Sequence, residues 1–122
     1  MPELPDAFLH GLDLLNNGEY FEVHEAIETA WRAEPGEIRQ LYQGILQVAV
    51  VYHHITHHNN KGARKLIRRV ISNLSPFIAT ELFDVPEIIK NMENIDSRLL
   101  RIGSDGSSGI NPELLKPVIL RQ

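Results

Sequence analysis

The sequence predicts an all-α, single-domain bundle of about five helices with a central third helix. Apolar residues recur at helical spacing through most of the chain, and no segment alternates as a half-buried strand would. Residue pairs that favour turns separate these periodic segments. The chain has 122 residues, of which 43% are hydrophobic, so it can bury one core.

Three helices are predicted in the first half of the chain. Residues 5–16 and 19–33 form the first two, which end at Asn17-Gly18 and Pro35-Gly36 because such pairs terminate helices. Residues 37–58 form the third. It is apolar nearly all round, which indicates a central position in the bundle.

Two more helices follow in the second half. The fourth begins near Lys61, has one apolar face, and is expected to bend or be interrupted at Ser75-Pro76. Asp84 and Glu87 form a capping box for the fifth, which extends to about Ile102.

The rest of the chain is predicted to be less regular. Residues 103–109 are rich in glycine and serine, which predicts a loop. Residues 110–122 are expected to form a tail that packs Leu114, Leu115 and Ile119 onto the bundle. The whole of residues 1–122 is therefore interpreted as one helical domain.

Composition excludes several classes of site. The chain has no cysteine, so disulfides, thiolate metal sites and cysteine nucleophiles are ruled out. The first residues are acidic where a signal peptide would be basic, and no apolar run reaches the length of a membrane span. We expect a cytoplasmic protein that does not enter a membrane.

Charge is distributed unevenly along the chain. Residues 1–37 carry a net charge of −8 and residues 38–80 carry +6. Most of the basic residues fall on the predicted fourth helix: Lys61, Arg64, Lys65, Arg68 and Arg69. We interpret them as a solvated face, neutralised by the acidic first third within the fold or across a homo-oligomer. An anionic ligand is the alternative, whereas nucleic acid is disfavoured because no aromatic residues are interleaved with the bases.

The second helix carries the most specific polar pattern. His24 and Glu28 are one helical turn apart, so their side chains can reach one point. They project between Phe21 and Trp31, and we expect both to be largely withdrawn from water. A buried carboxylate needs a proton, a cation or several hydrogen bonds. Glu22 and Glu25 are expected to face solvent.

A polar stripe on the third helix offers a counterpart. Gln43, Gln47 and His54 are aligned by their spacing, and His58 falls near the same stripe. His53 and His57 lie on a different face. The sequence thus predicts that His24, Glu28, Gln47 and His54 converge.

These residues resemble a known family. The stretch from Tyr20 to Trp31 has the pattern HxxxExxW, and Gln43-Gly44, Gln47, His54 and the residues 59–63 (NNKGA) follow in order. The pattern is similar to a bacterial and archaeal helical family, the domain of unknown function 309, sometimes described as predicted metal-dependent hydrolases. The resemblance covers about residues 7–80. It implies an all-helical fold and a metal role for His24 and Glu28, whereas the family's usual Gly-Asn is His58-Asn59 here.

Three interpretations of the site remain open. In the first, His24, Glu28 and His54 bind a divalent transition metal (zinc, iron or manganese). Glu28 or a neighbouring carboxylate then handles the proton of a metal-activated water during hydrolysis of an unknown small molecule. Gln43, Gln47 and Trp31 would then hold or orient what is bound. In the second, the polar residues only satisfy one another and fix helix packing, as in a non-catalytic structural or interaction module. The third is a metal-free binding or catalytic pocket.

Overall fold

The computed structural model describes residues 4–102 and 110–121. The described chain forms five α-helices and two short 3₁₀ helices: α1 (Asp6–Asn16), α2 (Tyr20–Ala33), α3 (Ile38–Thr56), α4 (Asn60–Leu74), η1 (Ser75–Phe77), α5 (Val85–Ile102) and η2 (Pro112–Leu114). No sheet occurs among these residues, where the only β contact is an isolated bridge between Phe83 and Leu120. The all-α prediction is confirmed. The loop predicted at 103–109 lies outside the described residues.

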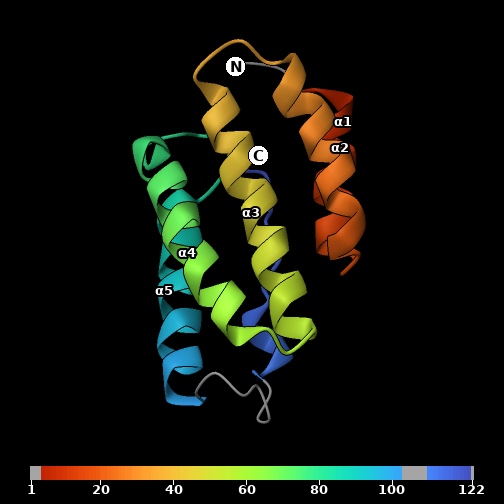
Figure 1. The fold of residues 1–122 in the computed structure, drawn as a ribbon. Coiled ribbons are helices and arrows are strands. Elements are labelled where there is room, and N and C mark those ends of the chain that lie inside the picture. Colours follow the sequence, from red (N-terminus) through yellow and green to blue (C-terminus); the bar gives the residue numbers. More distant parts are fainter. Residues whose placement is uncertain (1–3, 103–109, 122) are drawn as a thin grey trace.

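Helix α3 is central, as predicted. Figure 1 shows it between the α1–α2 pair on one side and the α4–α5 pair on the other. It packs against α2 and α4, while α1 packs on α2 and α5 on α4. No helix in the described part of the chain is long and apolar enough to cross a membrane.

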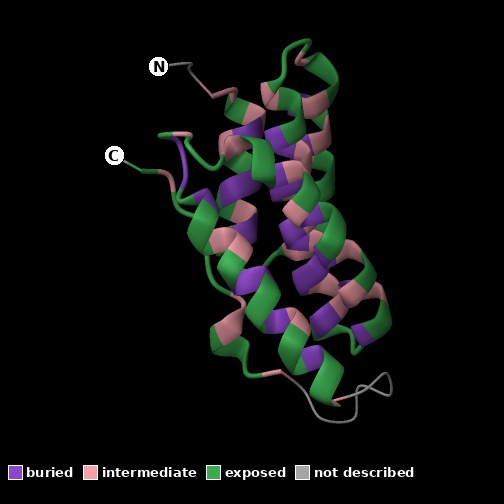
Figure 2. Cartoon of the chain, turned by 90° about the vertical axis from the view of Figure 1, so that its left-hand side faces the viewer, coloured by how far each residue is buried: buried purple, intermediate pink, exposed green. Residues whose placement is uncertain are grey.

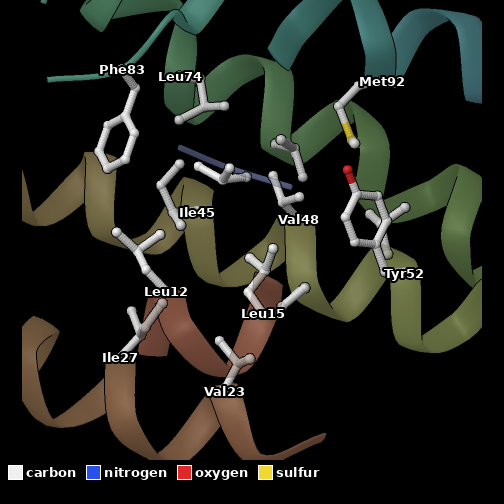
Figure 3. Close-up of a cluster of buried hydrophobic side chains, with 14 of the residues drawn as sticks. Leu12, Leu15, Val23, Ile27, Ile45, Val48, Tyr52, Leu74, Phe83 and Met92 are labelled. Atoms are coloured by element: carbon white, nitrogen blue, oxygen red, sulfur yellow. The ribbon is translucent and has the colours of Figure 1, made fainter. Parts of the chain in front are cut away.

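The core is built around α3. Figure 3 shows Ile45 and Val48 of α3 between apolar side chains of α1 and α2 below and of α4 and α5 above. Each helix turns its buried residues inward and leaves exposed residues outside (Figure 2). Every helix follows its periodic apolar stripe: Val23, Ile27 and Ala30 mark the buried face of α2, and Ala63, Ile67, Val70 and Leu74 that of α4.

Local sequence signals account for the helix ends. Gly18 has a φ of +82° and closes α1: the N–H of Gly18 donates to the carbonyl of Leu15 and the N–H of Glu19 to that of Leu14. The end of α3 has the same pattern with His58, at φ +58°, in the position of the glycine. Asn59 then caps α4 by accepting from the N–H of Gly62.

The tail of the chain docks on the bundle. The side chain of Asn16 makes two hydrogen bonds to the backbone of Val118, at 2.9 and 2.8 Å. The hydroxyl of Tyr52 donates to the carbonyl of Lys116. Leu114 and Leu115 pack on the core as predicted, but Ile119 does not, because it is 67% exposed and Val118 is buried instead. In the extended tail neighbouring side chains point to opposite sides, so only one of the two can face the bundle.

Candidate functional site

The polar motif of α2 lies at the surface. Nδ1 of His24 is 3.0 Å from Oε2 of Glu28, and the other carboxylate oxygen of Glu28 pairs with Arg32. The His24 side chain is 60% exposed and that of Glu28 is 24% exposed. The prediction that both are largely withdrawn from water is therefore wrong for His24, and Glu28 is only partly covered.

The position of Phe21 explains the difference. Its side chain is 74% exposed, so it does not extend the inward-facing apolar face of α2. The buried face of α2 is centred instead on Val23, Ile27 and Ala30, which pack between α1 and α3. His24 and Glu28 consequently border the buried face without entering it.

The polar stripe of α3 turns to α4 instead of α2. Oε1 of Gln47 accepts a hydrogen bond of 2.8 Å from the amide of Asn73. The amide nitrogen of Asn59 lies 3.2 Å from Nδ1 of His54. The structure thus joins His24 to Glu28, but it gives Gln47 and His54 separate partners on the α4 side.

The three predicted metal ligands do not form one group. Both carboxylate oxygens of Glu28 already have partners, and Nδ1 of His54 faces Asn59. Within residues 4–102 and 110–121, no three histidine, aspartate or glutamate side chains are placed so that they could hold one metal ion. As placed, His24, Glu28 and His54 therefore do not fit a three-ligand site.

An open groove does lie beside His24, between α2 and α3. Its volume is about 490 Å³, and it is lined by Tyr20, Phe21, Glu22, His24, Glu25, Val50 and His53. Glu22 and Glu25 are exposed, as predicted, yet they belong to the same groove as His24. We refer to this surface as the α2–α3 groove.

His53, which the sequence assigned to a different face, lines this groove together with His24. Its ring centroid is 5.9 Å from that of Phe21 and 4.1 Å from that of His57. Desolvation, followed by the neighbouring His57 and His54, lowers the pKa of His53, while Glu22 acts in the opposite direction. The order of the residues along the chain could have predicted this placement. Helices α2 and α3 are antiparallel and joined after Ala33, so the start of α2 lies beside the end of α3.

Trp31 and Gln43 lie at the other end of the α2–α3 pair. They line an open hollow of about 590 Å³ that also includes Asn73 of α4. The guanidinium of Arg39 lies 3.9 Å from the centroid of the Trp31 ring, and Nε of Arg39 donates to the Trp31 carbonyl at 3.2 Å. Trp31 therefore packs at the α2–α3 turn, partly buried against the core.

Comparisons with known proteins cover the part of the chain that carries these residues. Residues 8–66 match the model of a family described as a domain of unknown function, DUF309. An uncharacterized protein of Bacillus subtilis (strain 168), YpuF, is 37% identical over 54 residues, which are 43% of this chain and 31% of YpuF. No solved structure matches the chain. The segment from α1 into α4 is thus similar to a family whose description assigns it no function.

Proposed function

We propose that this protein is a non-catalytic interaction module that binds a basic, amphipathic segment of another protein in the α2–α3 groove. The observation that carries the proposal is Phe21, a large aromatic side chain that is 74% exposed on the wall of a groove. An exposed aromatic side chain next to a hollow is a frequent anchor of protein contacts. Val50 and Tyr20 supply further apolar surface beside it.

The charge of the groove determines the chemistry of the partner. Glu22 and Glu25 line it and form no ion pair with any described residue. Residues 1–37 carry a net charge of −8, so the wider α1–α2 surface also attracts cations. A partner that covers Phe21 would leave these carboxylates buried without a counter-charge unless it supplied lysine or arginine.

The shape of the groove suits a helix. It lies between two packed helices and has a volume of about 490 Å³. An amphipathic helix can place apolar side chains against Phe21 and Val50 while its lysines meet Glu22 and Glu25. The long aliphatic stems of lysine can also cover apolar surface while the charge stays in water.

A defined probe tests this proposal. The probe is a fluorescent synthetic helix with leucine on one face and lysine on the other. It should bind the protein, and the fluorescence anisotropy of the peptide should then rise. Phe21→Ser should weaken binding by about tenfold or more, since buried aromatic anchors dominate such interfaces. Glu22→Lys should weaken it as well and reduce its salt dependence.

Matched controls distinguish binding in this groove from nonspecific binding to exposed apolar or acidic surface. Ile78 is 59% exposed and does not line the groove, so Ile78→Ser should bind like the unchanged protein. A probe with glutamate in place of lysine should not bind. If the Phe21→Ser and Ile78→Ser variants bind the probe with equal affinity, the groove is not its binding site.

A metal-dependent hydrolase is the second candidate, and one contact favours it. A carboxylate that holds one nitrogen of an imidazole orients the other nitrogen toward a metal ion, and Glu28 lies 3.0 Å from Nδ1 of His24. With Glu28 in this orienting role, a complete site would still need further ligands. If His54 is one of them, the nitrogen that could serve is Nε2, because Nδ1 faces Asn59.

Metal binding is tested through stability. Zinc or manganese should raise the melting temperature of the metal-free protein at pH 7.5 and raise it less at pH 5.5, because protons compete for the ligands. Both His24→Ala and His54→Ala should abolish the increase, whereas His10→Ala, an exposed position on α1, should not. If no divalent ion shifts the unchanged protein, the hydrolase candidate fails and the interaction module is unaffected.

A further inference from the structure

A second groove lies on the opposite side of α3, between α4 and α5. It has a volume of about 380 Å³ and is lined by Asn60, Lys61, Arg64, Lys65, Arg68, Leu99 and Leu100. Figure 1 shows α4 and α5 on the far side of α3 from α1 and α2. The α4–α5 groove is therefore separate from the α2–α3 groove and shares no residue with it.

The positive charge of this groove is largely uncompensated. Residues 60–74 contain five basic residues and no acidic one. Among them only Arg64 has an acidic partner in the described chain, since its Nε donates to Oδ1 of Asp96 at 3.0 Å. Lys61, Lys65 and Arg68 form no ion pair with a described residue. No ion pair joins α4 to the α1–α2 pair among the described residues.

Apolar surface adjoins the charges. Leu99 is buried, with 1% exposure, but Leu100 next to it is 62% exposed and lines the groove with the lysines. The combination suits a ligand that has an anionic part and an apolar part.

We propose that the α4–α5 groove binds a compact organic phosphate. The phosphate groups would lie among Lys61, Lys65 and Arg68, which project from successive turns of α4, and the apolar part would lie on Leu100. Arg64 is held in place by Asp96, so its guanidinium orients the anion with little loss of side-chain entropy.

The observations favour a compact ligand over a nucleic acid strand. The groove holds four basic side chains and the whole chain has a net charge of −4, whereas nucleic acid surfaces are usually basic over a wider area. No aromatic side chain lines the groove for base stacking. This site goes beyond the proposed interaction module and does not depend on it.

Titration calorimetry with two probes tests both halves of the proposal. ATP without magnesium should bind in a saturable way, and inorganic tripolyphosphate should bind about threefold or more weakly because it lacks an apolar part. Leu100→Ser should make the two affinities equal. Lys65→Glu should weaken the binding of both probes by about tenfold or more.

A variant on the same helix provides the control for charge. Arg69 is exposed on α4 but does not line the groove, so Arg69→Glu changes the net charge as Lys65→Glu does and should alter affinity by less than about twofold. Equal losses in the two variants would show nonspecific attraction and overturn the site. Tighter binding of a single-stranded oligonucleotide of equal charge, or a self-association at low salt that Lys65→Glu abolishes, would also overturn it.

Discussion

The side chains of Gln47 on α3 and Asn73 on α4 are joined by a hydrogen bond of 2.8 Å. One turn earlier on α3, at Gly44, the two helices come so close that an added Cβ would lie 2.5 Å from Cδ2 of Leu74 and 3.4 Å from Cβ of Asn73. The glycine thus permits the close approach that brings the two amides together.

Gly44→Ala should therefore destabilise the protein. Leu74 is fully buried and cannot move aside freely, so the expected loss in the free energy of unfolding is about 1–3 kcal/mol. Urea denaturation measures it. Gly36→Ala is the control, because its Cβ would meet only the carboxylate end of the flexible Glu34 side chain. A similar loss in that variant would contradict the packing explanation.

His58→Gly should stabilise the protein. His58 has a φ of +58°, a left-handed conformation that disfavours side chains, and the hydrogen bonds around it are those of a helix end that usually carries glycine. We expect a gain of about 0.5–1 kcal/mol in urea denaturation. Gly18→Ala, at φ +82°, should show a loss of about 1 kcal/mol. A loss of stability in His58→Gly would instead show that the imidazole makes a stabilising contact.

His53 should make stability fall in weak acid. Its pKa is lowered in the folded state, mainly by desolvation and then by His57 and His54, so the unfolded chain binds more protons. Stability is thus retained above the ordinary histidine pKa of about 6.5 and decreases as the pH falls through it. His53→Gln should flatten the fall in melting temperature between pH 7.5 and 5.5. His10→Gln should leave it as steep as before.

Tyr52→Phe should loosen the tail. The Tyr52 hydroxyl is 2.8 Å from the carbonyl of Lys116 and 3.3 Å from Nδ2 of Asn91, so its removal leaves a carbonyl without its donor and should cost about 1–2 kcal/mol. Burial also raises the pKa of Tyr52. The folded state therefore keeps its proton above pH 10, and stability falls with rising pH there in the unchanged protein but less in the variant. Denaturation at pH 8 and pH 10.5 measures both effects.

The helices could be predicted closely because their signals are local. Gly18, Asn59 and Asp84 act within one turn of the helix end that they define, and the predicted bounds differ from the observed ones by at most two residues. The third helix is shorter than predicted because the chain already turns at His57.

The arrangement of the site could not be predicted in the same way. Whether Phe21 is covered depends on which helices pack beside α2, and the local sequence of α2 does not specify them. Gln47 had two possible neighbours, and the close approach at Gly44 selected α4. A polar stripe predicts that partners are needed but does not name the helix that provides them.

The contacts of the tail also determine the order in which the fold can assemble. Asn16 and Val118 are separated by 102 positions, whereas α1 and α2, or α3 and α4, are joined by short turns. The entropy of closing a long loop delays such distant contacts, so the tail should dock after the helices have packed. By the same argument it is the first part to detach in a partial opening, when the amides of Val118 and Arg121 would exchange hydrogen faster than those of α3. Tyr52 and Asn91 could then meet solvent while the five helices remain assembled.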